Sequence, residues 1–247
     1  MSPNPDLPPP SNPPWALAIE SLPAAGDVEQ LVVLLHGWGA DGASMQPLAD
    51  ALRAEFPQAA LLAPDAPQAT DGGRRGRMWY SIEGLPDDAL WAARVQSCLP
   101  ELQHWVLAQQ RRLDVRPAAC CLAGFSQGAI LSLALASRRD GLAGRVLAFG
   151  GCYVTPPQVA PRLTTLHFFH GSDDRVIPVE GSRRALEQLG ALQGDATIDI
   201  AHGIGHELHP ALIDRALFRL RHHIPMRTWQ AALGAVAADG AGAAGDT

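Results

Sequence analysis

The chain has 247 residues, of which 47% are hydrophobic and 18% are charged, as in a globular protein with one sizeable core. Its formal net charge of −6 argues against nucleic acid or an anionic membrane surface as the main partner. All nineteen basic residues are arginines, which excludes Schiff-base enzymes, Walker-type phosphate loops and Ser-Lys hydrolases.

The two ends of the chain lack core-forming residues. Seven of the first fourteen residues are proline, and the last nine are only Asp, Gly, Ala and Thr. This composition predicts a disordered proline-rich arm over residues 1–14 and a disordered Gly/Ala tail over 238–247. No linker or repeat interrupts the rest, so a single domain is expected over residues 15–237.

The four cysteines, Cys98, Cys120, Cys121 and Cys152, form no Cys-x-x-Cys pair, so neither a disulfide framework nor a zinc site is expected. Adjacent Cys120 and Cys121 should point to opposite faces of a strand as small core residues. No apolar run reaches membrane-spanning length, and the start of the chain does not resemble a signal peptide. These features predict a cytoplasmic protein without stable membrane association.

Strand and helix patterns alternate along the chain. Apolar runs that predict strands occur at 16–20, 30–35, 59–63, 118–122, 145–149, 164–169 and 196–201. Helical patterns occur at 44–55, 88–113, 127–138, 181–192 and 208–222. Most of the apolar runs are continuous, which is typical of parallel strands buried on both faces. The alternation predicts an α/β fold, mostly parallel, with helices on both faces of the sheet and ligands at the carboxyl ends of the strands.

Two connecting segments are informative through their length. Only about fourteen residues separate the strand ending at Phe149 from the strand starting near Thr164, which leaves no room for a cap domain there. The longest irregular segment is 64–87, and irregular segments of that length are usually functional or mobile. We expect it to form one wall of the site. Its arginines, Arg74, Arg75 and Arg77, either steer an anionic substrate or are solvated loop charges.

The pentapeptide Gly124-Phe125-Ser126-Gln127-Gly128 lies where a predicted strand meets a predicted helix. A Gly-x-Ser-x-Gly turn at such a junction holds the serine hydroxyl clear of the chain, because the glycines remove side chains that would clash. A serine is a useful nucleophile only when a base lies beside it. The pattern therefore predicts Ser126 as a nucleophile rather than as part of a plain connecting turn.

The base and its orienting acid should follow the serine, in the order Ser, acid, His. The histidines after the last predicted strand are His202, His206 and His209, and His206 is favoured because it lies in the flexible segment Gly203-Ile204-Gly205-His206. A metal site formed by the three is the less favoured interpretation, since no His-Glu-x-x-His pattern is present. The acid is Asp173 or Asp174, which spacing alone does not separate.

Acyl transfer also needs two backbone N–H groups that point at the developing oxyanion. The residue after the nucleophile, Gln127, supplies one of them. The other is expected from the loop His36-Gly37-Trp38-Gly39, where the N–H of Trp38 is the candidate donor. A plain glycine-rich turn is the alternative interpretation of that loop.

Four segments together resemble the phospholipase/carboxylesterase family of α/β-hydrolases, which includes acyl-protein thioesterases and bacterial cytoplasmic carboxylesterases. They are Leu35–Gly39, Gly124–Gly128, His170–Pro178 and Gly203–His206. The resemblance spans about residues 28–225 and implies an α/β-hydrolase fold without a cap domain. In that family the acid stands four residues before a proline, which selects Asp174.

The resemblance extends to Arg77-Met78-Trp79-Tyr80-Ser81, which is similar to an aromatic loop that borders the acyl site of the bacterial branch. It implies Met78, Trp79 and Tyr80 as substrate-binding residues, although Trp79 is equally expected to pin the loop to the body of the protein. The Pro-rich arm and the C-terminal extension lie outside the family pattern.

These observations predict a serine hydrolase of short-to-medium acyl esters, or thioesters, that works through a covalent acyl-enzyme without cofactor or metal. We expect a monomer or a homodimer. A dienelactone-hydrolase-like or a cofactor-free haloperoxidase-like enzyme is an alternative, although the first would normally carry Cys at position 126. An inactive binding module is the other alternative, but no residue of the expected site is missing.

Overall fold

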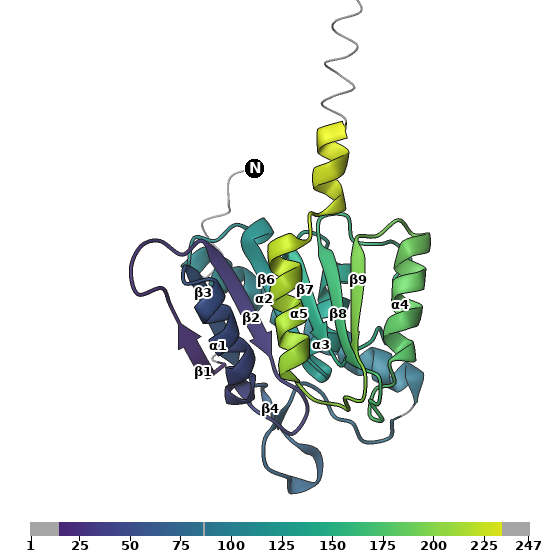
Figure 1. Cartoon of the computed structure of the whole chain (residues 1–247). Helices are drawn as coiled ribbons and strands as arrows, with labels where there is room; N and C mark the ends of the chain where they lie inside the picture. Colours follow the sequence, from purple (N-terminus) through teal and green to yellow (C-terminus); the bar gives the residue numbers. More distant parts are fainter. Residues whose placement is uncertain (1–14, 86, 234–247) are drawn as a thin grey trace, which may run out of the picture.

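The computed structural model describes residues 15–85 and 87–233 (Figure 1). The arm expected over 1–14 and the tail expected over 238–247 lie outside the described residues, and the limits of the single domain stay predictions. The described residues form an α/β structure in which a central sheet has helices on both faces.

The sheet has seven strands in the order β1-β3-β2-β6-β7-β8-β9. They are β1 (Leu17–Ser21), β2 (Gln30–Leu35), β3 (Ala59–Pro64), β6 (Cys120–Phe125), β7 (Arg145–Phe149), β8 (Thr165–Gly171) and β9 (Ala196–Ala201). All neighbours are parallel except β1, which pairs antiparallel with β3. After β2 the chain moves to β3 on one side, and after β6 it moves to β7 on the other. The loops after β2 and β6 therefore diverge, and in open α/β sheets such a switch point is where ligands bind.

Five helices cover the sheet: α1 (Gln46–Glu55), α2 (Asp88–Arg112), α3 (Gln127–Arg138), α4 (Glu180–Ala191) and α5 (Pro210–His222). Helices α1 and α5 contact each other on one face, and α2 and α3 contact each other on the other (Figure 1). Residues 226–233 form a further helix, which the sequence patterns did not predict. None of the described helices is both long enough and apolar enough to cross a membrane.

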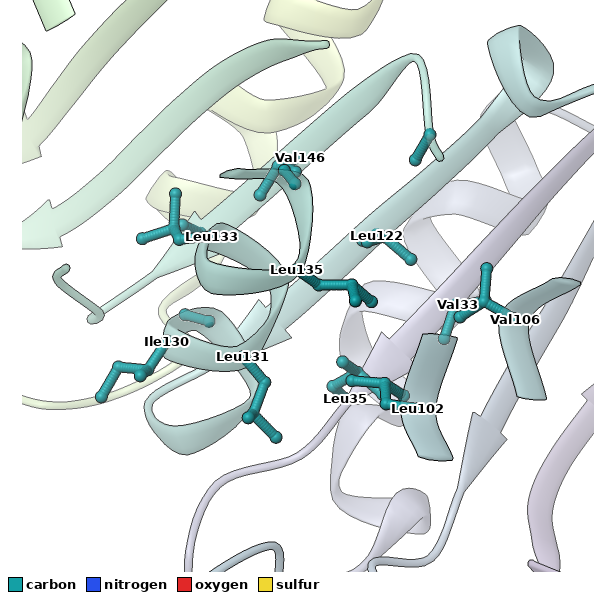
Figure 2. Close-up of a cluster of buried hydrophobic side chains, with 14 of the residues drawn as sticks. Val33, Leu35, Leu102, Val106, Leu122, Ile130, Leu131, Leu133, Leu135 and Val146 are labelled. Atoms are coloured by element: carbon teal, nitrogen blue, oxygen red, sulfur yellow. The ribbon is translucent and has the colours of Figure 1, made fainter. Parts of the chain in front are cut away.

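The sheet separates two hydrophobic cores. Along β2, Leu31, Val33 and Leu35 face the α2/α3 core, part of which Figure 2 shows, whereas Val32 and Leu34 face the α1/α5 core. Cys120 and Cys121 divide between the two cores in the same way, as predicted. Burial on both faces explains why these strands are continuously apolar in sequence.

Two segments differ from the expectations. The strand predicted at 118–122 lies at Cys120–Phe125, because Pro117 begins a short 3₁₀ helix that takes up Ala118 and Ala119. The segment 64–87 is more regular than expected, since it contains the antiparallel strands β4 (Gln68–Ala69) and β5 (Arg77–Met78). Residues 150–164, between β7 and β8, contain no helix or strand.

Candidate active site

Ser126 lies at the tip of a sharp turn between β6 and α3. Its backbone has φ 55° and ψ −116°, a conformation that side-chain-bearing residues rarely adopt. A Cβ on Gly124 would lie 2.2 Å from the carbonyl carbon of Gly128, and a Cβ on Gly128 would lie 2.0 Å from the carbonyl oxygen of Leu35. Only glycine fits either position, and the strained turn presents Ser126 at the carboxyl edge of the sheet.

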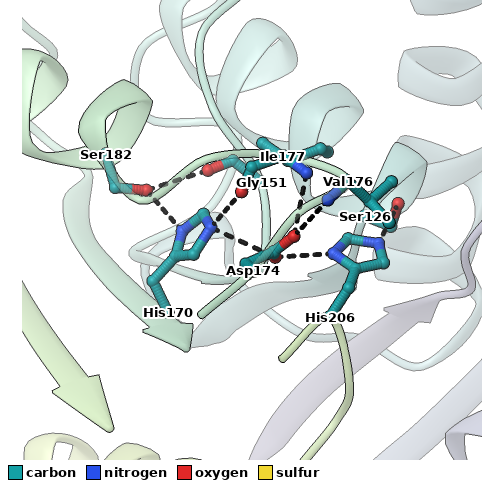
Figure 3. Close-up of polar contacts among 8 residues, drawn as sticks. All are labelled: Ser126, Gly151, His170, Asp174, Val176, Ile177, Ser182 and His206. Carbon is teal, nitrogen blue, oxygen red and sulfur yellow. Dashed lines mark hydrogen bonds and ion pairs between the residues drawn. The ribbon is translucent and has the colours of Figure 1, made fainter. Parts of the chain in front are cut away.

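His206 and Asp174 complete a hydrogen-bonded row with Ser126 (Figure 3). The Ser126 hydroxyl lies 3.0 Å from Nε2 of His206 and faces its lone pair. On the other side of the ring, Nδ1–H donates to Oδ2 of Asp174 over 2.6 Å. The imidazole packs against Phe125, with ring centroids 4.8 Å apart. The three side chains come from loops after β6, β8 and β9, which meet at one edge of the sheet.

The structure places Asp174, rather than Asp173, against His206. Oδ1 of Asp174 accepts the backbone N–H groups of Val176 and Ile177, each over 2.9 Å. Asp173 instead accepts the Ser172 hydroxyl at the exposed side of the loop. Two backbone donors on one oxygen leave the other oxygen of Asp174 directed at the imidazole.

The remaining candidate histidines lie apart from the serine. His209 precedes α5, where its Nδ1 accepts the N–H of Ala211 over 3.2 Å, and His202 is exposed. The three expected candidates therefore separate into one histidine beside Ser126, one helix cap and one surface residue. No group of three or more potential metal ligands was found in residues 15–85 and 87–233.

The backbone N–H groups of Trp38 and Gln127 flank the Ser126 turn. Within the described residues, no protein acceptor is found for either N–H. Gln127 is the first residue of α3, where N–H groups have no partner inside the helix and the helix dipole favours negative charge. Trp38 lines the same cavity as Ser126. The two N–H groups therefore stay the candidate oxyanion donors that the sequence predicts.

His36 fastens the loop that carries Trp38. Its ring is fully buried, with Nδ1–H donating to the carbonyl of Gly37 over 2.7 Å and Nε2 accepting the N–H of Ala66 over 3.0 Å. Burial lowers the pKa of His36, which keeps the ring neutral and leaves Nε2 free to accept. The sequence places His36 in this glycine-rich loop, but no local pattern reveals its contact with Ala66, thirty residues away.

A second contact fixes the same loop to the segment 64–87. The backbone of Arg77 exchanges hydrogen bonds with Gly39 and Ala40, over 2.9 and 2.7 Å. The Arg77 guanidinium donates to the carbonyls of Ala66 and Pro67. Arg77 is thus a structural residue rather than a solvated charge. Arg74 lies over the Trp38 ring at 5.8 Å from its centroid.

The three residues expected to bind substrate lie in different environments. Tyr80 lines the cavity beside Ser126, whereas Met78 and Trp79 do not appear in its lining. Trp79 is only 2% exposed, meets the Trp15 ring edge-on, and donates its Nε1–H to the carbonyl of His36 over 2.9 Å. Of the two expectations for Trp79, the structure favours the one in which it pins the loop.

The side chain of Gln127 holds this wall in place. Its Oε1 accepts the N–H of Trp79 over 3.1 Å, and its Nε2 donates to the carbonyl of Tyr80 over 2.8 Å. Because the amide satisfies two buried backbone groups, it ties the cavity wall to the residue that carries an oxyanion donor. Sequence reasoning assigned only the backbone of Gln127.

The cavity beside Ser126 has a volume of about 480 Å³. Its lining comes from five connecting segments and from α2 and α3: Trp38, Tyr80, Ile82, Leu85, Trp91, Ser126, Gln127, Ile130, Val176, Ile177 and His206. Most of these side chains are apolar, and the polar ones gather at the serine. Such a pocket suits a hydrocarbon chain whose polar end lies at Ser126.

The parallel sheet with a strained serine turn and a following acid and histidine defines the class of α/β-hydrolases. The model of the Phospholipase/Carboxylesterase family matches residues 19–224, and the chain belongs to this family.

Individual relatives agree with this assignment. The chain is 35% identical to "Esterase YpfH" of Escherichia coli (strain K12) over 205 residues, which cover 83% of this chain and 88% of that protein. It is 26% identical to "Acyl-protein thioesterase 1" of Gibberella zeae over 222 residues, covering 83% and 94% of the two chains. The crystal structure of esterase PE8 superposes with a TM-score of 0.77 at 31% identity, covering 84% of this chain and 99% of the other.

Proposed function

We propose that the protein hydrolyses carboxylic esters or thioesters of short-to-medium acyl chains, with Ser126 as the nucleophile, His206 as the base and Asp174 as the orienting acid. The observation that carries the proposal is the unbroken row from Ser126 Oγ through His206 to Asp174, with contacts of 3.0 and 2.6 Å. The family and its relatives define a hydrolase of this substrate class.

The reaction follows from where the protons lie. Ser126 attacks the acyl carbonyl while Nε2 of His206 takes the hydroxyl proton, and the resulting imidazolium is stabilised by Asp174. The N–H groups of Trp38 and Gln127 receive the oxyanion of the tetrahedral intermediate. His206 then protonates the leaving alkoxide or thiolate, and later removes a proton from the water that hydrolyses the acyl-enzyme. No step of this sequence calls for a cofactor or metal.

The apolar cavity supports the assignment of the acyl side. Tyr80, Ile82 and Leu85 line it from the segment 64–87, and Ile130 lines it from α3. We therefore assign acyl-chain binding to Tyr80 and its neighbours, and loop support to Trp79 and Met78. A volume of about 480 Å³ suits a chain of limited length.

The location of the protein, the class of its substrate and its oligomeric state are also proposed. Cys98, Cys120, Cys121 and Cys152 are all unpaired, which supports a reducing, cytoplasmic location. The net charge of −6 supports a small-molecule substrate over nucleic acid or a membrane surface. A monomer or a homodimer fits the sequence.

Labelling with a fluorophosphonate probe tests the nucleophile, because only an activated serine reacts. The wild-type chain and Ser132→Ala, which alters a buried serine in α3 outside the cavity lining, should label and hydrolyse p-nitrophenyl esters. Ser126→Ala should do neither. Parallel rates with p-nitrophenyl esters and acyl-CoA thioesters of increasing length then give the chain preference. Labelling of Ser126→Ala would overturn the proposal.

A further inference from the structure

Two imidazole rings lie beside the same carboxylate oxygen in the site. Besides Nδ1 of His206, Oδ2 of Asp174 has Nε2 of His170 at 3.3 Å (Figure 3). The proposed reaction gives His170 no part. We propose that His170 is a positioning residue for acyl transfer, which holds Oδ2 of Asp174 and sets how strongly that oxygen stabilises protonated His206.

The proton on His170 is located by its neighbours. Nε2 faces the carbonyl oxygen of Ile177 at 2.7 Å and the carboxylate oxygen of Asp174 at 3.3 Å. Both atoms only accept hydrogen bonds, so Nε2 carries the proton and points it between them. Asp174 is ionised in the proposed mechanism, and a donor this close to its Oδ2 competes directly with His206 for the same charge.

The far side of the ring is anchored to other elements. Nδ1 lies 2.8 Å from the hydroxyl of Ser182 in α4, and that hydroxyl lies 2.9 Å from the carbonyl of Gly151, after β7. The Ser182 hydroxyl donates to the Gly151 carbonyl and so links Nδ1 of His170 to that segment. Burial lowers the pKa of His170. His170 and Ser182 are both fully buried. The imidazole is therefore held rigidly between β8, α4 and the segment after β7.

This arrangement fixes Asp174 on both oxygens. Oδ1 takes the N–H groups of Val176 and Ile177, and Oδ2 takes the two imidazoles, so the carboxylate has no free rotation. An oxygen that loses one of two donors becomes a stronger acceptor for the other. Without His170, Asp174 would stabilise protonated His206 more strongly but be held less firmly.

The other groups near this contact do not obscure the effect of His170 on the pH dependence of activity. Cys152, in the segment after β7, is close enough to act on Asp174, and burial raises the pKa of its thiol to about 11, so it stays neutral in the assay range. From α4, Arg184 is close enough to act on Cys152 but lies at the surface. Asp174 and His206 are thus the ionisable side chains that act on the ring.

The experiment is the pH dependence of kcat/KM, whose acid limb reports protonation of the base in the free enzyme. His170→Phe keeps the ring but loses both nitrogens. Its acid limb should move up by about 0.5 to 1 pH unit, and its plateau should fall roughly tenfold. His170→Gln places an amide N–H near Nε2 and should return the limb toward the wild-type position. Ser182→Ala keeps the Nε2 donor and should leave the limb where it is.

The result that overturns the proposal is a His170→Phe enzyme whose rate falls while its acid limb stays in place, because a packing role moves only the rate. If that variant does not fold, histidine ¹⁵N spectra of the wild-type chain decide: a proton on Nε2 of His170 supports the proposal, and a proton on Nδ1 alone overturns it. The proposal rests on the function above, so Ser126→Ala is assayed in parallel. An active Ser126→Ala enzyme would refute the function itself, whatever His170 does.

Discussion

The folded protein should lose stability below pH 6.5 because of His167, which lies in β8 outside the proposed active site. The ring is 0% exposed, its Nδ1 lies 2.8 Å from the hydroxyl of Thr197, and its Nε2 has no partner among the described residues. Burial, reinforced by the nearby side chains of Arg145 and His223, lowers the pKa of His167 from 6.5 to about 3. Below pH 6.5 the unfolded chain therefore binds a proton at His167 that the folded chain does not bind.

Proton linkage gives the direction and the magnitude of this change in unfolding free energy. Between pH 6.5 and about 3 the unfolded state binds more protons at this site, so stability rises with pH and is lost as pH falls. One pH unit is worth about 1.4 kcal/mol for one proton. At pH 5, roughly 1.5 units below the unfolded pKa, this single ring should cost about 2 kcal/mol of unfolding free energy.

Urea unfolding followed by circular dichroism at pH 7.5 and pH 5 measures the effect in wild type and His167→Phe. The variant loses the Thr197 hydrogen bond at both pH values, so its pH-dependent loss should be smaller by about 2 kcal/mol. The buried His36 and His170 titrate in both proteins and cancel in the difference. His222→Phe, at an exposed position, should keep the wild-type slope. Equal losses in wild type and His167→Phe would show that the ring is not buried as the structure has it.

Four further outcomes are expected. Asp174→Ala should lower esterase kcat by about 10³-fold or more and Asp173→Ala only slightly; the reverse order in initial rates would refute the choice of acid. Gly128→Ala should be inactive and less stable, since its Cβ would lie 2.0 Å from a β2 carbonyl oxygen, whereas Gly190→Ala, with open space around it, should unfold at an unchanged or higher temperature. Trp79→Ala should cost about 3–5 kcal/mol in urea unfolding and slow all chain lengths alike, because the ring lies in the core rather than the cavity. The rate on tributyrin should rise smoothly through its solubility limit, since residues 150–164 contain no helix or strand that would form a lid; a sharp jump would contradict this.

The sheet could be predicted from sequence because its strands are buried on both faces. Runs such as 30–35 and 145–149 are continuously apolar after their first residue, and the structure places strands at the same residues. The strand near 120 was displaced because Ala118 and Ala119 are apolar without belonging to it. The small sheet of β4 and β5 was missed, since two-residue strands are held by pairing with distant partners such as Ala40 and leave no local pattern.

The residues of the site likewise divide into those that a local sequence pattern predicts and those that no such pattern predicts. A strained serine between glycines has a local signature, and Ser126 follows from it. The contacts of Gln127 with Trp79 and Tyr80 join residues nearly fifty positions apart, and no spacing rule reveals them. Trp79 shows the limit most clearly, because an aromatic residue in a site loop has the same sequence appearance whether it lines the pocket or supports it.

These supporting contacts explain how a site without a cap in the segment 150–164 is assembled. Enzymes that close over their substrate complete the catalytic geometry on closure, whereas here the geometry is present in the free protein. Three parts of the site are each held by a buried polar side chain: His36 holds the loop with Trp38, Gln127 holds the cavity wall, and His170 holds the acid. Each of these side chains satisfies backbone groups that the loops would otherwise bury unpaired, so removing one costs both stability and alignment. Substitutions at His36 and His170 should therefore lower kcat more than they raise KM, because they displace the proposed catalytic groups. A substitution at Gln127 should raise KM as well, because its amide holds the wall of the proposed acyl cavity.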